Sequence, residues 1–370
     1  MRTCLLLGGL LLVAGQLWAQ LPNNAPTGAR LLLKDGWQLH SSSKIEQKGE
    51  VLSTEGYQPA GWYPTSVPST VLGALVANKV YPDPYVGMNL RSIPGTSYPV
   101  GGNFSNLAMP EDSPFAKSWW YREEFKVPAE FAGKQVWLHF YGINFRANVW
   151  LNGKRVADAS QVAGAWRLYE FNVTDLVKHN RTNVLAVEVF APKADDLAIT
   201  FVDWNPLPAD KGMGLWRDVC LTASGPVALR WPQVVTHFDS PSLDLAHLTV
   251  NAEVRNATDS KVRGILRGQI GQADFSQQVE LAPNETREVT FSPEKFPQLN
   301  IRNPRVWWPA QLGPQNLYTL KMGFECAAKV SDWQTVQFGI REITSELTDK
   351  NFRLFKINGK NILIRGRLDI

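Results

Sequence analysis

Most of the chain alternates apolar and polar residues at the period of a β-strand. Before residue 224 the clearest runs are residues 121–127, 135–142, 148–156 and 182–190. Short alternating runs separated by turn residues are typical of an antiparallel β-sandwich. Within the third run, Asn152-Gly153 is a dipeptide favoured in two-residue hairpin turns. The pattern therefore predicts a sandwich domain that ends near Ser224.

A second series of alternating runs begins after Gly225-Pro226. It contains about seven strand-like runs at regular spacing, which is typical of an immunoglobulin-like sandwich. A hairpin with Asn358-Gly359 at its turn follows, and then the apolar strand 362–364. A lone hairpin cannot bury a core. We therefore expect this last segment either to extend the preceding sandwich or to begin another domain.

One segment, residues 67–80, has helical periodicity instead. Its apolar residues fall on one face of a helix: Val71, Leu72, Leu75 and Val76. Ser69 precedes them and is of the residue type preferred at an N-cap. The pattern predicts one short helix on an otherwise β domain.

The composition is that of a globular chain. Of 370 residues, 44% are hydrophobic and 19% are charged, and this length corresponds to roughly two or three domains. The formal net charge is +4 and is dispersed along the chain, so a nucleic-acid partner is not expected. The five histidines are scattered and no CxxC pair occurs. No metal site and no cofactor is predicted.

The N-terminus reads MRTCLLLGGLLLVAGQLWAQ, which predicts a secretory signal peptide over residues 1–19 with cleavage after Ala19. The alternative is an N-terminal anchor, but the apolar run is too short to span a bilayer. A secreted or periplasmic protein with no membrane span after cleavage is expected. Cys220 and Cys326 then remain. They fall in different predicted domains, so free thiols are expected, although an oxidising compartment would permit a pair.

Several stretches together resemble a known family. They are GINFRANVWLNGKRV, TNVLAVEVF, DWNPLPADKGMGLWRDV, NPRVWWPAQLGPQNLYTL, FGIREIT and FRLFKINGKNILIRG. In this order they resemble the N-terminal half of a family 2 glycoside hydrolase. The third stretch, residues 203–219, is most similar to the exo-β-glucosaminidase and β-mannosidase branch.

The resemblance implies an all-β fold in successive parts. A jelly-roll, galactose-binding-like sandwich that binds sugar is expected over residues 20–224, and an immunoglobulin-like β-sandwich over 225–344. Residues 345–370 would be the truncated start of a catalytic (β/α)8 barrel, which takes about 250 residues when complete. The family hydrolyses O-glycosyl bonds with retention, using two glutamates on the barrel. No catalytic residue is therefore assigned here, and the chain alone is expected to be inactive.

The resemblance also implies a sugar-facing loop, because in the family a loop of the first domain reaches over the barrel mouth. Asp203 would then hydrogen-bond a terminal β-linked sugar, and Trp204 and Asn205 would shape the wall. Charge-assisted hydrogen bonds and aromatic faces suit sugar recognition. The alternative is that Asp203 caps a turn and Trp204 fills a gap between domains.

Other conspicuous residues are interpreted as structural. Residues 216–218, Trp-Arg-Asp, open a strand that heads back into the sandwich. Asn144 and Arg146 have two interpretations. They either face the barrel or support the fold, and the supporting role is expected at least as much. Trp307-Trp308 has the character of an interdomain packing motif.

No carboxylate pair in the sandwiches is expected to hydrolyse a glycoside. Glu123-Glu124 and Asp195-Asp196 are sequence neighbours, so on a strand the members of each pair point to opposite faces. Asp203 and Asp210 share a loop, but nothing in the sequence raises the pKa of one relative to the other.

Three hypotheses about function stay open. The chain is the accessory part of a secreted β-glycosidase, incomplete through a truncated gene model or a frameshift. It is a non-catalytic carbohydrate-binding protein. Or it is an interaction module whose barrel-facing surface meets another chain. The stop falls one strand into the expected barrel and not near Thr344, which favours the first hypothesis. Carbohydrate and the missing barrel are then the expected partners.

Overall fold

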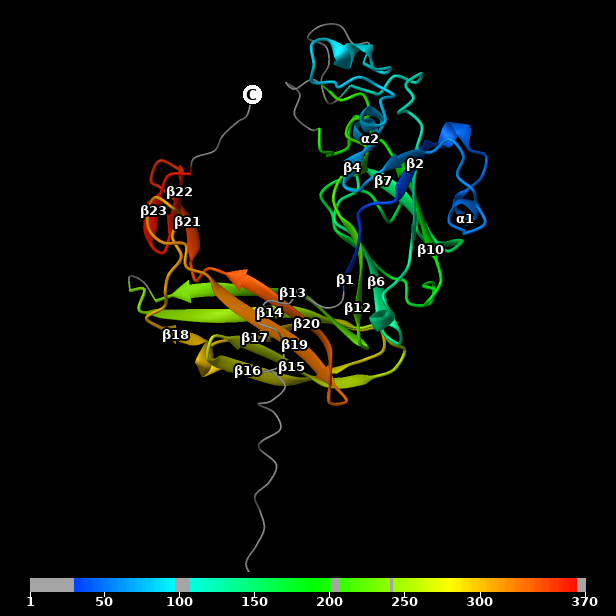
Figure 1. Ribbon diagram of the computed structural model, residues 1–370. Helices are drawn as coiled ribbons and strands as arrows, with labels where there is room; N and C mark the ends of the chain where they lie inside the picture. Colours follow the sequence, from blue (N-terminus) through cyan, green and yellow to red (C-terminus); the bar gives the residue numbers. More distant parts are fainter. Residues whose placement is uncertain (1–29, 97–106, 201–206, 240–241, 365–370) are drawn as a thin grey trace, which may run out of the picture.

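The structure is a computed structural model that describes residues 30–96, 107–200, 207–239 and 242–364 (Figure 1). Every strand pairing within these residues is antiparallel, and the helices are short. The antiparallel, mostly β architecture predicted from the alternating pattern is confirmed.

The first domain contains a four-stranded and a six-stranded sheet. The smaller sheet has the order β1 (Arg30–Leu33), β12 (Val219–Ser224), β6 (Gln135–Phe140) and β9 (Tyr169–Asn172). The larger has the order β3 (Tyr63–Thr65), β2 (Trp37–Ser41), β5 (Trp119–Phe125), β10 (Asn183–Phe190), β7 (Arg146–Leu151) and β8 (Lys154–Ala157). A separate two-stranded sheet joins β4 (Ser69–Thr70) to β11 (Gly214–Leu215).

Inward-facing residues of the four-stranded and the six-stranded sheet form one apolar core, in which Tyr121, Leu138 and Val187 are buried. The outer face of β5 and β10 is covered as well, because Trp120 and Trp150 lie in a second buried cluster. Each large apolar side chain buried in this way stabilises the fold by about 1.5–3 kcal/mol. Burial on both faces explains why β5 departs from simple alternation.

The helices are α1 (Gly49–Leu52) and α2 (Val71–Ala77), with 3-10 turns at Ser42–Lys44, Asn89–Ser92, Ala129–Phe131 and Pro297–Leu299. The predicted helix is therefore present as α2. The prediction that Ser69 is its N-cap is wrong. Thr70 is the N-cap, and its hydroxyl accepts a hydrogen bond from Gly73 N at 3.0 Å. Ser69 instead pairs with Leu215 in the two-stranded sheet.

The second domain is also a sandwich. One sheet has the order β13 (Val227–Phe238), β14 (Leu245–Asn256) and β17 (Thr286–Phe291), and β18 (Asn300–Arg302) also pairs with β14. The other has the order β16 (Ala273–Leu281), β15 (Val262–Ile270), β19 (Tyr318–Cys326) and β20 (Lys329–Phe338). The core between the sheets contains Leu248, Val250, Phe291 and Phe324. Regular alternation along β14 places every second side chain in this core.

A third sheet comprises β21 (Ile343–Leu347), β22 (Arg353–Ile357) and β23 (Lys360–Ile362). Figure 1 shows this sheet and the first domain at opposite ends of the second sandwich. The β22–β23 turn has positive φ at Asn358 (48°) and Gly359 (76°), and the β7–β8 turn has it at Asn152 (53°) and Gly153 (82°). Positive φ at both central residues is the geometry that Asn-Gly favours, so both predicted hairpins are confirmed.

Within the described ranges, no helix has the length and apolar character that crossing a membrane requires.

Candidate functional site

The predicted sugar-facing residues Asp203, Trp204 and Asn205 lie outside the described residues. The structure does describe the segment that follows them, from Leu207 onward. This segment is largely buried through β11. The site can therefore be built from the groups that anchor the loop.

Asp210 is the central anchor of this segment. Its carboxylate is 1% exposed and accepts hydrogen bonds from Leu72 N at 2.7 Å and Gly212 N at 2.9 Å. Burial raises the pKa of Asp210 to about 6, against the hydrogen bonds that favour its charged form. The sequence offered no reason to separate Asp210 from Asp203. The structure makes Asp210 the link between the loop and the start of α2.

Asn144 holds the same segment from the other side. It is fully buried, and its Nδ2 donates to the carbonyl oxygens of Lys211 at 3.0 Å and Gly212 at 2.8 Å. The backbones of Asn144 and Gly214 also exchange hydrogen bonds at 2.9 and 2.8 Å. Lys211 is buried too, and its ammonium donates to Leu107 O. These contacts give Asn144 the fold-supporting role that was one of its two interpretations.

The Trp-Arg-Asp segment is structural, as expected. Trp216 Nε1 donates to Ala165 O at 3.0 Å, and its ring meets Trp166 edge-on at 5.0 Å. Arg217 lies over the Trp216 ring, and Asp218 is 3.5 Å from Arg30. This segment therefore fastens the loop to neighbouring parts of the first domain.

Arg146 and the Trp307-Trp308 pair also make structural contacts. Arg146 forms a two-point ion pair with Asp196 at 2.5 and 2.6 Å. The Trp307 carbonyl accepts from Asn358 Nδ2 at 3.0 Å, and Lys360 Nζ lies 4.8 Å from the Trp308 ring centre. The two tryptophans thus contact the third sheet, which agrees with a packing role.

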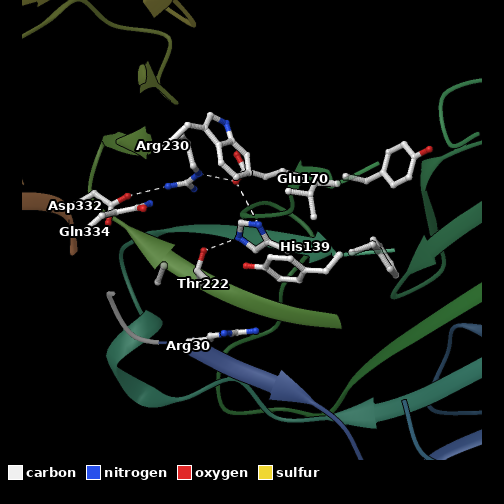
Figure 2. A pocket seen from close by; sticks show the side chains of 13 residues that line it. Arg30, His139, Glu170, Thr222, Arg230, Asp332 and Gln334 are labelled. Carbon is white, nitrogen blue, oxygen red and sulfur yellow. Dashed lines mark hydrogen bonds and ion pairs between the residues drawn. The ribbon is translucent and has the colours of Figure 1, made fainter. Parts of the chain in front are cut away.

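A second cluster of polar residues lines a small cavity of about 160 Å3 at the junction of the two domains. Figure 2 shows Arg30, His139, Glu170 and Thr222 of the first domain facing Arg230, Asp332 and Gln334 of the second. None of these residues was singled out from the sequence. Their strands were predicted, but the pairing of distant strands brings them together.

Arg230 is the centre of this junction cluster. Its guanidinium donates to Glu170 at 2.6 Å and to Asp332 at 2.9 Å, so it bridges the two domains (Figure 2). Arg255 adds a contact to Glu170 at 3.7 Å. Both arginines also lie over the Trp137 ring, at 5.2 and 4.8 Å from its centre. A planar cation stacks on an aromatic face while its edges remain free to donate.

Thr222, His139 and Glu170 are connected like a nucleophile, a base and an orienting acid. His139 Nε2 lies 2.7 Å from the Thr222 hydroxyl, and Nδ1 lies 3.3 Å from Glu170. Such connectivity is characteristic of acyl-transfer enzymes. However, burial and the positive charges of Arg230 and Arg30 lower the pKa of His139 to about 3.

A histidine with so low a pKa is a poor general base. Because the imidazole is neutral above that pH, the 3.3 Å contact between Nδ1 and Glu170 is not an ion pair. Glu170 is already engaged by Arg230 and Arg255, and the cavity is below the usual size for a substrate. The junction cluster therefore holds the domains together and does not support catalysis.

The carboxyl of Glu123 has a pKa raised further above its ordinary value than that of Asp210. Its side chain is buried against Gly36, and its Oε2 has no hydrogen-bond partner among the described residues. Burial raises the pKa of Glu123 to about 8, with further contributions from the negative charges of Asp35 and Glu124. Glu124 is exposed and pairs with Arg122. The two side chains therefore lie in different surroundings. This agrees with the prediction that neighbours on a strand point to opposite faces.

Metal ligands do not gather in the part of the chain that the structure describes, where no three His, Cys, Asp or Glu side chains could jointly hold an ion. Cys220 and Cys326 are free thiols. Cys220 is on β12 of the first domain and Cys326 on β19 of the second.

Comparisons with known proteins identify the class of these domains. Two family models match the chain. One, described as "Glycosyl hydrolase 2 galactose-binding domain-like", matches residues 112–201. The other, described as "Glycosyl hydrolases family 2", matches residues 227–341. The first sandwich is thus galactose-binding-like, and the second is the immunoglobulin-like domain that accompanies it.

Curated relatives agree with this assignment. An exo-beta-D-glucosaminidase of Streptomyces avermitilis is 36% identical over 332 residues, which cover 90% of this chain and 34% of the relative. A mannosylglycoprotein endo-beta-mannosidase of Lilium longiflorum is 28% identical, over 90% of this chain and 36% of the relative. This chain therefore spans about a third of the length of these relatives.

Solved structures agree as well. The exo-chitosanase of Amycolatopsis orientalis superposes with a TM-score of 0.79 and 33% identity, covering 92% of this chain and 37% of the other. A beta-glucuronidase of Bacteroides uniformis has a TM-score of 0.62 at 18% identity, which supports the fold alone. The chain belongs to glycosyl hydrolase family 2 and carries its N-terminal galactose-binding-like and immunoglobulin-like domains. The resemblance and the fold class inferred from the sequence are confirmed.

Proposed function

We propose that this chain supplies the sugar-facing accessory domains of an exported β-glycosidase that acts in carbohydrate metabolism on terminal β-linked glucosamine or mannose units. The observation that carries the proposal is the 36% identity to an exo-beta-D-glucosaminidase, which extends over 90% of this chain. A match of that extent includes both sandwiches and the segment between them.

The chemistry of the proposed enzyme divides between its parts. Retaining hydrolysis needs a nucleophilic carboxylate and an acid/base carboxylate about 5 Å apart across the sugar. In this proposal the catalytic (β/α)8 barrel supplies both. The accessory domains orient the terminal sugar, since a misplaced substrate loses much of the rate.

Asp203 is the residue proposed to contact a hydroxyl of that sugar, with Trp204 and Asn205 as the wall beside it. Two features of the described residues support this. Asp210 and Asn144 hold the segment immediately after these residues through buried hydrogen bonds. These bonds fix the backbone of residues 210–212, so the chain that carries Asp203 is held on its C-terminal side.

The test uses the enzyme complete with its catalytic barrel and compares Asp203→Ala with Asp203→Asn. Loss of a charge-assisted hydrogen bond to substrate costs about 1.5–3 kcal/mol, or about ten- to a hundredfold in kcat/KM. Asparagine caps a turn as well as aspartate does. The proposal expects both variants to lose activity on aryl β-glucosaminides or β-mannosides at unchanged Tm. If Asp203→Asn has full activity while Asp203→Ala is destabilised, Asp203 caps a turn and the assignment fails.

Export is a separate part of the proposal and rests on the N-terminal pattern of Arg2, an apolar run and Ala19. Mass spectrometry of the protein from its natural source should find a mature N-terminus at Gln20. An intact Met1 in the purified protein would exclude cleavage.

A further inference from the structure

A hollow of about 840 Å3 lies beside the anchored loop and has no role in the function proposed so far. Its walls come from α2, from residues 83–90 and from residues 208–212. The apolar side chains of Leu72, Val76 and Leu90 contribute to its lining. Its volume is within the range of small-molecule binding sites.

Tyr85 is the most distinctive residue of this hollow. Its side chain is 96% exposed, the largest exposure among the large hydrophobic residues that the structure describes. Val86 and Met88 beside it are exposed as well. An aromatic ring that the described residues leave almost fully exposed at the wall of a hollow is available to stack on a ligand.

The turn that carries Tyr85 is held by hydrogen bonds. Asp83 Oδ1 accepts from Tyr85 N at 2.9 Å, and the Asp83 carbonyl accepts from Asn89 Nδ2 at 3.0 Å. Thr96 Oγ1 donates to the carbonyl oxygens of Leu90 and Ile93 at 2.8 and 2.7 Å, and Ile93 is buried. The ring is therefore presented from a defined backbone, which reduces the entropy lost on binding.

The charged residues described at the hollow are both acidic. Asp83 and Asp210 are among the described residues that line it, and none of those residues is basic. Asp83 is exposed, whereas Asp210 is buried. Such a hollow favours a cationic ligand over an anionic one.

The chain also limits how far the hollow can lie from the proposed sugar contact. Pro208, which lines it, is five residues after Asp203. Five residues of fully extended chain span at most about 18 Å. A saccharide of several units that contacted Asp203 could therefore extend to the hollow.

We propose that the hollow is a subsite for a second unit of a β-linked amino-sugar oligosaccharide, with the Tyr85 ring against the face of the pyranose and the Asp83 carboxylate paired with its ammonium group. A β-linked pyranose presents C–H groups on its face, which suit an aromatic ring. A carboxylate–ammonium contact adds a charge-assisted hydrogen bond. The inference rests on the proposed function, because it names a longer substrate for the same loop.

The experiment titrates the chain with a tetramer of β-linked glucosamine and follows binding by NMR. Cellotetraose, which has hydroxyls in place of the amines, is the neutral comparison. We expect saturable, millimolar binding of the amino tetramer and at least about fivefold weaker binding of cellotetraose. Tyr85→Ala should weaken binding of the amino tetramer about five- to tenfold.

Asp83→Asn tests the charge alone, since an asparagine oxygen can still accept from Tyr85 N. It should remove the preference for the amino tetramer and leave cellotetraose binding unchanged. Phe352→Ala, which truncates another exposed aromatic side chain, is the matched control and should change neither affinity. The Tm of each variant establishes that it is folded.

The proposal is overturned if the amino tetramer does not bind, if Tyr85→Ala binds it equally well, or if cellotetraose binds with equal affinity. These outcomes are separable from failure of the proposed function. In the complete enzyme, hydrolysis of glucosaminyl fluoride, which has a single sugar unit and a one-atom leaving group, depends on Asp203 and should be unaffected by Tyr85→Ala.

Discussion

At the scale of single residues, buried carboxyl groups decide how the loop that follows Asn205 is held. Asp210 accepts two backbone hydrogen bonds, one from Leu72 N in the first turn of α2 and one from Gly212 N in its own loop. The charged form is stabilised by these donors, while burial opposes it and raises its pKa to about 6. Asp210 is therefore a structural acid, and its removal would be felt in stability first.

Asp210→Ala should lower the free energy of unfolding by about 2–5 kcal/mol, because it leaves Leu72 N and Gly212 N buried without an acceptor, at about 1–3 kcal/mol each. Urea denaturation followed by tryptophan fluorescence measures the change. Asp218→Ala is the matched control, since its pair with Arg30 is exposed at 3.5 Å and should cost at most about 1 kcal/mol. A loss below about 1 kcal/mol for Asp210→Ala would contradict its role as an anchor.

Glu123 should make the first domain less stable as the pH rises. Its pKa is about 8 in the folded chain, above the ordinary value of 4.5, so the folded state binds this proton more tightly than the unfolded state. The stabilisation is complete below about pH 4.5 and is lost as the pH rises toward 8.

Thermal unfolding of the wild type and Glu123→Gln between pH 5 and pH 8 tests this. Glu123→Gln should remove part of the decrease in Tm across this range and should be the more stable protein at pH 8 by a few degrees, about 1 kcal/mol or more. Glu130→Gln, at an exposed position, should follow the wild type. Parallel Tm profiles for the wild type and Glu123→Gln would show that Glu123 is ionised in the folded chain.

At the scale of elements, the junction between the sandwiches depends on strands that meet through charged side chains. Glu170 lies on β9, Arg230 on β13 and Asp332 on β20. Arg230 is 8% exposed at its side chain and is shared between the two acids. Because ion pairs have directional geometry, they define the relative orientation of the domains better than apolar contacts alone would.

Glu170→Ala should destabilise this junction by about 2–4 kcal/mol, because it leaves Arg230 partly unpaired in a desolvated position. Calorimetry should then resolve unfolding of the two domains as separate transitions where the wild type has one. Glu280→Ala, which breaks an exposed cluster with Lys261 and Arg263 on one sheet, should leave the unfolding profile unchanged. A single transition at the wild-type temperature in Glu170→Ala would exclude the cluster as the connection.

At the scale of the whole molecule, the third sheet exposes an apolar surface. Every residue of β21 is exposed, and Ile343, Leu347, Phe352, Leu363 and Ile364 are each more than half exposed. Exposed apolar side chains, where they form a large patch, mark interaction sites or lead to association. In the proposed enzyme this surface would meet the catalytic barrel.

The purified chain should therefore bind an apolar dye and self-associate at micromolar concentrations, as measured by fluorescence and by sedimentation. Replacing Ile343 and Leu347 together by threonine, a polar residue that is well suited to strands, should reduce both signals. A dye-silent monomer with the native sequence would argue that the patch needs no partner.

The chain alone should hydrolyse no glycoside. Among its described acids, Glu123 and Glu124 lie in different surroundings, Asp196 is bound to Arg146 and Asp210 is buried. None of these acids belongs to a pair of carboxylates that could lie on either side of a sugar. Assays against aryl β-glucosaminides, β-mannosides, β-glucosides, β-galactosides and β-glucuronides should give no turnover. Activity that persists through purification and disappears on mutation of one acid within residues 20–345 would refute this.

Strands in both sandwiches, the two Asn-Gly hairpins, the existence of α2 and the family could be predicted from the sequence, whereas β1, β2, β3 and β9 were not predicted. Side-chain alternation and turn conformation depend on residues a few positions apart, so they can be predicted from the linear sequence. Which polar residues are buried depends on the tertiary structure. The contact between Asp210 and Leu72 joins residues 138 positions apart, and that between Arg230 and Glu170 joins residues 60 apart. Burial and partners of this kind set the pKa values of Asp210, Glu123 and His139. They arise from strand pairing across the fold, which no local pattern contains.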